Sequence, residues 1–277
     1  MLNSRYRHSF FLAALAAAAS ACGSDRRSIT APTPDPLPTV LLKDIVIPHL
    51  PEPYYHFEYD ATGRMTAASF ASDLTMYTLT YTGGRLSEMQ NNILVNHDRL
   101  VYSYDNAGHV REVDYIDANG VVFTQVGFVY DGAKLTGVER KRKASTGFVV
   151  DKRLTLAYGG DGNLSALTEH RPAIAGVQDD ATFTDTFENY DGGINVDGFG
   201  LLHDEFFDHL ILLPRVQLQK SNPARITRTG DGDNYRVEYS YLYDGSNRPR
   251  SKTGTVTFTS GPLTGQQFPV GAFFTYY

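Results

Sequence analysis

The sequence predicts an all-β protein built as an antiparallel meander of repeated hairpins. A short unit recurs along the chain: an alternating apolar stretch ends on tyrosine, and in most copies aspartate and then glycine follow. Between the first five tyrosines of this unit the spacings are 22, 23, 26 and 28 residues. A period of this size indicates a repeated supersecondary unit and fits two strands per unit. The anchor tyrosines are Tyr59, Tyr81, Tyr104, Tyr130, Tyr158 and Tyr243.

The residues of one unit predict the turn that joins its two strands. The first copy reads Tyr59-Asp60-Ala61-Thr62-Gly63-Arg64-Met65. Aspartate at the first turn position accepts hydrogen bonds from nearby backbone amides, and glycine three residues later supplies a positive φ. Together they favour a type I turn with a glycine bulge. Asn247 replaces glycine in the last copy, which is tolerable because asparagine enters the left-handed region more easily than most residues.

The first 21 residues are interpreted as a lipoprotein signal peptide. Arg5 and Arg7 precede a short apolar run, and small residues then lead to Cys22, the single cysteine of the chain. The apolar run is shorter than the ~20 residues that cross a bilayer. The region resembles a bacterial lipobox, which implies that Cys22 carries a lipid. The alternative is an ordinary signal peptide in which the cysteine stands by chance.

Composition changes after the signal peptide. Residues 22–52 are rich in proline and polar residues, which predicts an extended, semi-rigid tether. Within it the apolar stretch from Val40 to Ile47 leaves open a first or edge strand. Residues 53–277 are then a single β domain, because one domain of this length is common among all-β proteins.

The hairpin pattern breaks at about 171–223, and this insert is the candidate region for chemistry. Apolar residues at helical spacing predict one short helix near 202–213. Its other face carries Asp204, Asp208 and His209, which are candidate ligands for a divalent metal. A solvated acidic face explains the same residues. An acidic loop region nearby could bind calcium, although it lacks EF-hand spacing; it holds Asp179, Asp180, Asp185, Asp191 and Asp197.

The tyrosine-rich strand faces allow two interpretations. One is a platform on which sugar rings stack, and the other is the inner lining of a curved sheet, which aromatic residues favour without any ligand. The second is the favoured interpretation. For the first, the candidate binding residues are Tyr59, Tyr81, Tyr104, Tyr130, Tyr239 and Tyr241.

Charge excludes one class of partner. The formal charge of −6 argues against nucleic acid, which needs a basic surface. The basic run Arg140-Lys141-Arg142-Lys143 is interpreted as a solvated strand end, with contact to lipid phosphates as the alternative. The last strand is apolar and ends on Tyr277, but charged residues on other exposed strand faces argue against insertion in a bilayer.

The Tyr-Asp-x-x-Gly-Arg units resemble the YD repeats of Rhs-type bacterial surface proteins. With Phe187-Glu188-Asn189-Tyr190-Asp191 and Lys220-Ser221-Asn222-Pro223, the region from Pro53 to Tyr277 resembles a family of short bacterial lipoproteins of unknown function. That family is described as having a porin-like β fold. The resemblance implies a curved or closed, barrel-like sheet, and it brings no catalytic residues.

The favoured function is that of a non-enzymatic lipoprotein of the cell envelope. It would be attached to the membrane, most simply the outer membrane, through the lipid on Cys22, without a cofactor. Its sheet would bind a glycan, a peptide or an envelope protein. Two alternatives stay open: a metal-dependent hydrolase built in the insert, and a small barrel or pore component.

Overall fold

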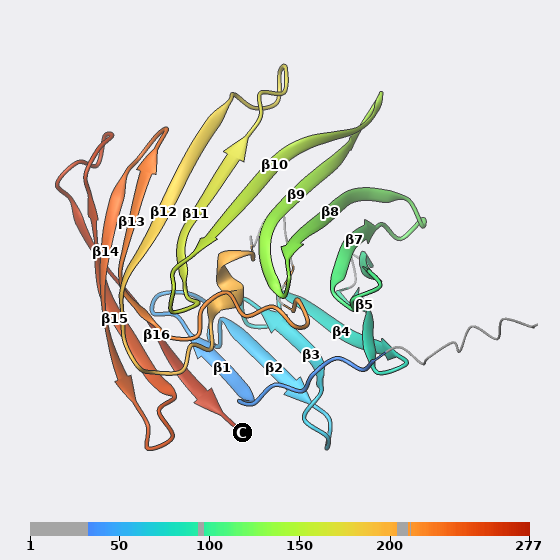
Figure 1. Cartoon of the computed structure of the whole chain (residues 1–277), viewed down its shortest axis with the longest axis horizontal. Coiled ribbons are helices and arrows are strands. Elements are labelled where there is room, and N and C mark those ends of the chain that lie inside the picture. The colour runs from blue at the N-terminus through green and yellow to red at the C-terminus, as the bar shows by residue number, and fades with distance from the viewer. Residues whose placement is uncertain (1–32, 94–96, 204–209, 211) are drawn as a thin grey trace, which may run out of the picture. The chain divides into compact units, whose positions relative to one another are not determined.

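The computed structural model describes residues 33–93, 97–203, 210 and 212–277. They belong to one compact unit, residues 32–277. In this part of the chain sixteen strands form a closed antiparallel barrel (Figure 1). The fold class predicted from the sequence, an all-β meander that forms a curved or closed sheet, is confirmed.

The strands follow one another around the barrel in chain order. The first eight are β1 (Leu42–Val46), β2 (Tyr55–Tyr59), β3 (Met65–Phe70), β4 (Thr75–Thr82), β5 (Arg85–Asn91), β6 (Arg99–Tyr104), β7 (Val110–Ile116) and β8 (Val122–Asp131). The others are β9 (Lys134–Ala144), β10 (Gly147–Tyr158), β11 (Leu164–Arg171), β12 (Ala181–Tyr190), β13 (Pro223–Gly230), β14 (Tyr235–Tyr243), β15 (Pro249–Phe258) and β16 (Gln267–Tyr276).

Pairing of the first and last strands closes the barrel. Ile45 of β1 lies opposite Phe274 of β16, and Val46 lies opposite Phe273. Strand β1 lies within the predicted tether, at the apolar stretch that the sequence left open as a first or edge strand. A closed sheet leaves no unpaired edge, so the backbone groups of β1 and β16 are satisfied by each other.

The hairpin turns have the predicted chemistry. In the first copy the Asp60 carboxylate accepts hydrogen bonds from the amides of Thr62 and Arg64, at 2.8 and 3.0 Å. Gly63 has φ of 85° and Asn247 has φ of 61°, so both occupy the left-handed region. The strand register shifts at each of the six anchor tyrosines, as a bulge there requires. All these turns lie at one end of the barrel, which we call the Tyr-Asp end.

Strand residues alternate between a buried inner face and an exposed outer face. The inner residues form one hydrophobic core that includes Phe57, Leu86, Leu100 and Leu135. Outer positions carry ion pairs, such as Arg99 with Glu88 at 3.0 Å, Arg153 with Glu139 at 2.9 Å and Arg225 with Glu238 at 3.0 Å. The outer wall therefore carries ion pairs beside exposed apolar side chains such as Val129, Leu242 and Phe273.

Residues 191–222, which we call the insert, stand in place of a short turn between β12 and β13, and their described part, residues 191–203, 210 and 212–222, enters the barrel (Figure 1, orange). Phe199 packs against Tyr55 and Phe57 of β2, with ring centroids 5.5 and 5.7 Å apart. On another side Leu202 and Leu210 face the wall formed by β7 to β10, leaving a space of only about 10 Å³. The insert thus spans the lumen from β2 to the wall of β7 to β10.

The insert is narrower than the range 171–223 set from the sequence, because β12 and the loop before it lie in that range. Its described helical segment is the 3₁₀ helix η1 (Gly198–Leu201). The predicted helix near 202–213 falls largely outside the described residues. Among the residues that the structure describes, no helix is long and apolar enough to cross a bilayer.

Candidate ligand-binding site in the barrel lumen

The anchor tyrosines tie neighbouring hairpins together. The hydroxyls of four anchor tyrosines, and that of Tyr190, lie within hydrogen-bond distance of the carbonyl of the first apolar residue after the preceding Tyr-Asp turn. The pairs are Tyr81 with Met65, Tyr104 with Leu86, Tyr130 with Val110, Tyr158 with Leu135 and Tyr190 with Leu164, at distances between 2.6 and 3.0 Å. This contact satisfies the polar end of a half-buried aromatic side chain.

In four of the turns a basic residue covers the ring of the next tyrosine along the barrel. Its cationic group lies 4.4 to 5.3 Å from the ring centroid, within the range of a cation–π contact. The pairs are Arg64 over Tyr81, Arg85 over Tyr104, Lys134 over Tyr158 and Arg248 over Tyr276. His109 stacks on Tyr130 in the same way, with centroids 4.6 Å apart. Tyrosine and the basic residue of the repeat therefore have an architectural role.

Burial has an electrostatic consequence for these tyrosines. It raises the pKa of Tyr81 to about 12, with Arg64 acting in the opposite direction. Burial likewise raises the pKa of Tyr158 to about 12. Both hydroxyls therefore keep their protons, and hence their hydrogen bonds, well above neutral pH.

A cavity of about 520 Å³ lies in the lumen near the Tyr-Asp end. Three parts of the chain line it: residues 35–40, the inner face of β1 to β4, and the insert. Most of the lining is apolar and includes Leu37, Val40, Phe57, Met65, Val196 and Leu212. Volume and lining are those of a small-molecule site, since such sites are mostly apolar with a few placed polar groups.

The cavity is covered by residues 33–41, which we call the strap and which lead into β1 (Figure 1, blue). Asp35 holds it in place. Its amide donates to the Gly84 carbonyl at 2.9 Å, and its Oδ2 accepts a hydrogen bond from the Leu86 amide at 2.9 Å. The Tyr104 hydroxyl lies 3.0 Å from the same oxygen. The strap is thus fixed to the turn between β4 and β5.

The insert holds the strap from the other side. The Nη2 of Arg215 donates to the carbonyl of Pro34 at 2.8 Å, and its Nε lies 3.7 Å from Oδ1 of Asp35. Arg215 has φ of 68°, in the left-handed region that few residues other than glycine adopt. Such a conformation persists only where surrounding contacts impose it, and it is common at ligand sites.

Gly84 allows the strap to lie across its turn. A Cβ built at this position would lie 2.7 Å from the Cβ of Pro34, too close for any real side chain. The residue also has φ of 78°. Glycine is therefore required here by the close approach of the strap as well as by the backbone conformation.

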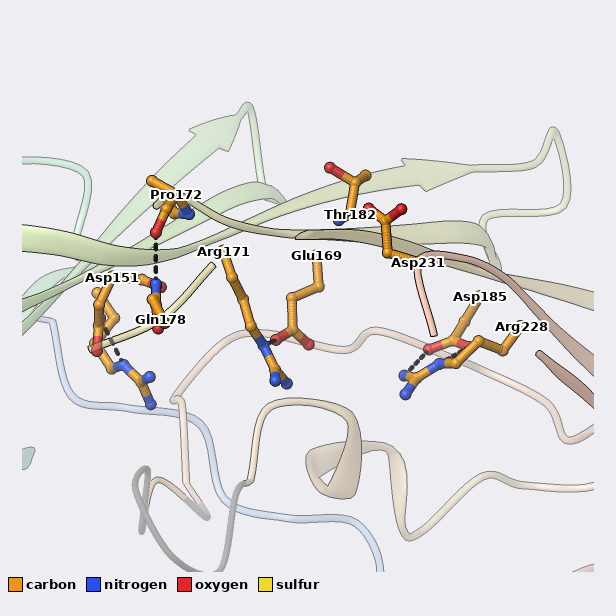
Figure 2. Close-up of polar contacts among 10 residues, drawn as sticks. Asp151, Glu169, Arg171, Pro172, Gln178, Thr182, Asp185, Arg228 and Asp231 are labelled. Carbon is orange, nitrogen blue, oxygen red and sulfur yellow. Dashed lines mark hydrogen bonds and ion pairs between the residues drawn. The ribbon is translucent and has the colours of Figure 1, made fainter. Parts of the chain in front are cut away.

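The inner face of β9 to β13 carries a second group of polar residues. Figure 2 shows the side chains of Glu169, Arg171, Asp185 and Arg228 projecting to the same side of neighbouring strands. The ion pairs are Arg140 with Asp151 at 2.9 Å, Arg142 with Asp151 at 2.7 Å, Arg171 with Glu169 at 2.5 Å and Arg228 with Asp185 at 2.6 Å. The hydrogen bond to Asp185 raises the pKa of Arg228.

These ion pairs on the inner face of the barrel correct one interpretation of the sequence. Arg140 belongs to the basic run that was interpreted as a solvated strand end, yet its exposed fraction is 7%. The signal was present, because Arg140 and Arg142 alternate with Glu139 and Lys141 in register with the inward-facing Val138. Strand parity indicates their direction, but the carboxylate that pairs with them comes from another strand.

The predicted tyrosines occupy different places. Tyr59 and Tyr81 line the cavity, and Tyr104 holds the strap that covers it. Tyr130 forms the contact between hairpins. Tyr239 and Tyr241 lie on β14 with ring centroids 6.1 Å apart, and Lys252 stands over Tyr239, outside the cavity lining. Ligand binding by these residues stays a prediction.

The predicted metal ligands Asp204, Asp208 and His209 lie outside the described residues, as does Cys22. Within the described ranges, no group of three His, Cys, Asp or Glu side chains is placed to hold a metal ion. Four of the five acidic residues of the calcium hypothesis contact different side chains. Asp180 pairs with His170, Asp185 with Arg228 and Asp197 with Lys252, and Asp191 contacts the Tyr243 hydroxyl.

Known structures share this barrel. A porin-like protein from Bacteroides uniformis ATCC 8492 is 14% identical, with a TM-score of 0.56 over 88% of this chain and 100% of that chain. A porin-like protein from Bacteroides vulgatus ATCC 8482 gives the same identity and TM-score over 86% and 99%. The likeness is one of fold. No protein-family model and no curated protein matches the chain.

Proposed function

We propose that the protein is a non-enzymatic binding protein of the bacterial envelope, and that its ligand site is the cavity under the strap. The observation that carries the proposal is the cavity itself, about 520 Å³ of mostly apolar space that is bounded by wall, insert and strap and open to solvent on one side. A barrel filled by its own insert provides a rigid frame for such a site. The proposal includes membership of the YD-repeat lipoprotein family and attachment through a lipid on Cys22.

A pore is the second candidate, because the structural neighbours are porin-like barrels. Two observations favour binding over conduction. The insert packs against β2 and against the wall of β7 to β10. The outer wall carries ion pairs, whereas a barrel in lipid needs an apolar outer band ~25 Å tall. The proposed barrel therefore works beside the membrane rather than within it.

The binding proposal is tested with N-phenyl-1-naphthylamine, an uncharged apolar dye that fluoresces when it leaves water. We expect saturable binding of one dye to the full chain. Val196→Trp fills part of the cavity and is expected to weaken binding about tenfold or more. The matched control is Val129→Trp, at a 60% exposed position on β8 outside the cavity lining.

Two results would overturn the proposal: no saturable binding to the full chain, or equal weakening by the two tryptophan variants. A pore predicts something else. Reconstituted in lipid bilayers, the full chain would then give discrete conductance steps, and we expect none.

A further inference from the structure

We infer that the cavity selects an amphiphile with one apolar chain and a carboxylate head group, and that the guanidinium of Arg64 binds this head group. The inference rests on the proposed function and names the ligand class of the same site. It is carried by the charge of the cavity, because Arg64 is a lining residue whose charge no ion pair with the described residues balances.

The charged side chains of the lining do not cancel. Among the residues that the structure describes, Asp35, Arg64 and Arg215 line the cavity and carry a charge. Nε of Arg215 lies 3.7 Å from Oδ1 of Asp35, so these two charges balance each other. One positive charge remains, on Arg64, although the whole chain has a formal charge of −6. Apolar walls screen a charge less than water does, so the cavity attracts anions.

Arg64 differs from the arginine at the same position of the last Tyr-Asp turn. There Nη2 of Arg248 lies 2.8 Å from Oδ2 of Asp244, four residues before it, and Nε donates to the same oxygen at 2.8 Å. The guanidinium of Arg64 lies over the ring of Tyr81, 4.9 Å from the centroid, and forms no hydrogen bond or ion pair with the described residues. Its N–H groups are therefore available to a ligand.

The acidic residue of the same turn is engaged elsewhere. Oδ1 of Asp60 accepts hydrogen bonds from the hydroxyl and the amide of Thr62, at 2.6 and 2.8 Å, and from the amide of Arg64 at 3.0 Å. Asp60 is also exposed, so water screens its charge. It therefore weakens the attraction between Arg64 and an anion only slightly.

A carboxylate suits this donor. The planar guanidinium presents paired N–H groups that match the two oxygens of a carboxylate. Arg64 is half-buried, so a head group beside it keeps part of its hydration and avoids most of the cost of burying a charge. The apolar chain would extend from there along lining residues such as Met65, Phe57 and Val196. An ammonium head would be repelled by Arg64, and an uncharged head would gain less from it.

The test compares three ligands that share one chain length: decanoate, monodecanoylglycerol and decylammonium. Each is titrated by calorimetry into the full chain at neutral pH, below its micelle concentration. We expect decanoate to bind about tenfold more tightly than either of the others, since hydrogen bonds between charged groups are the strong ones.

Three variants of Arg64 then separate its charge from its packing on Tyr81. Arg64→Gln should weaken decanoate about tenfold and leave monodecanoylglycerol unchanged. Arg64→Glu should make decylammonium the best ligand, and Arg64→Lys should keep the preference for decanoate. The matched control is Lys134→Gln, which removes the cation over Tyr158 in another Tyr-Asp turn, outside the cavity lining. It is expected to keep the original order.

The outcomes separate the two proposals. If neither the three ligands nor N-phenyl-1-naphthylamine binds the unmodified chain, the proposed function fails. If decanoate binds no more tightly than the others, or if Arg64→Gln weakens all three ligands alike, the cavity binds apolar chains and the head-group inference fails. A preference for decylammonium in Arg64→Glu cannot come from lost packing, so it would support the inference even if that variant is less stable.

Discussion

The regular wall of the barrel and its two irregular segments, the strap and the insert, use polar residues differently. In the wall, tyrosine hydroxyls donate to carbonyls of the neighbouring hairpin, and turn aspartates accept from their own backbone. In the irregular segments, Asp35 and Arg215 form an ion pair at 3.7 Å, and their other polar atoms bond to neighbouring segments. Polar groups of the wall join one hairpin to the next, whereas those of the strap and insert fix these two segments over the cavity.

The difference teaches where to look for function in a repeat protein. The abundant tyrosines invite a binding role, but their rings and hydroxyls are largely used between hairpins. The cavity lies where the repeat is interrupted, between the strap, the insert and the first strands. Four predictions test this difference between the wall and the irregular segments, and those with the largest expected effects come first.

Alkaline pH should act on the whole wall at once. Burial raises the pKa of Tyr81 and Tyr158 from 10.0 to about 12. As pH rises, the unfolded chain loses the protons of these tyrosines before the folded chain does. The stability that the protonated, buried hydroxyls contribute is therefore complete below pH 10 and is lost as pH rises through 12. We expect the melting temperature to fall steeply over that interval, measured by circular dichroism. An unchanged melting temperature up to pH 12 would contradict the role of the tyrosine contacts.

Phe57→Ala removes the contact between the wall and the insert. Phe57 is 2% exposed and meets Phe199 at 5.7 Å, so we expect a loss of about 3–5 kcal/mol in the free energy of unfolding. The measurement is chemical denaturation, with Val129→Ala on the outer wall as a control within about 0.5 kcal/mol of the parent. Equal losses would mean that the insert is not packed as described.

Gly84→Ala should loosen the strap. An added Cβ would meet Pro34, whereas at Gly120 it would meet nothing within 4 Å. The two glycines have φ of 78° and 79°, so Gly120→Ala reproduces the backbone cost alone. By hydrogen exchange, we expect the Leu86 amide, which donates to Asp35, to lose protection about tenfold more in Gly84→Ala. Equal protection would show that the strap does not depend on this turn.

Tyr104→Phe and Tyr130→Phe compare two anchor tyrosines. The Tyr130 hydroxyl donates to Val110 alone, whereas the Tyr104 hydroxyl lies between Leu86 and the strap carboxylate of Asp35. We expect losses of about 1 kcal/mol for Tyr130→Phe and about 2 kcal/mol for Tyr104→Phe, since hydrogen bonds to charged groups are worth more. The reverse order in thermal unfolding would contradict the strap's attachment.

Local chemistry explains why much of the fold was predictable. Short-range signals specify the hairpins. They are the alternation of apolar and polar residues before each tyrosine, the aspartate and glycine of turns such as the one at Asp60, and the asparagine that replaces glycine at Asn247. Each hairpin is specified by about ten consecutive residues, so its strands and bulge can be deduced without knowing the rest of the chain. The meander follows because consecutive antiparallel strands usually pair.

The site itself depends on contacts far apart in the sequence. Asp35 meets Leu86 and Arg215, which lie 51 and 180 residues away. Nothing in the Pro-rich stretch around Asp35 distinguishes a free tether from a strap bound across the barrel. The inner position of Arg140 was readable from strand parity, but its burial depends on Asp151 in the next strand. Such pairings cannot be deduced from local pattern.

A crystal structure of the full chain with N-phenyl-1-naphthylamine tests the central claim most directly. The account predicts that the dye lies between β1 to β4 and the insert, under the strap. Ligand bound only on the outer wall, with the cavity filled by water, would contradict it.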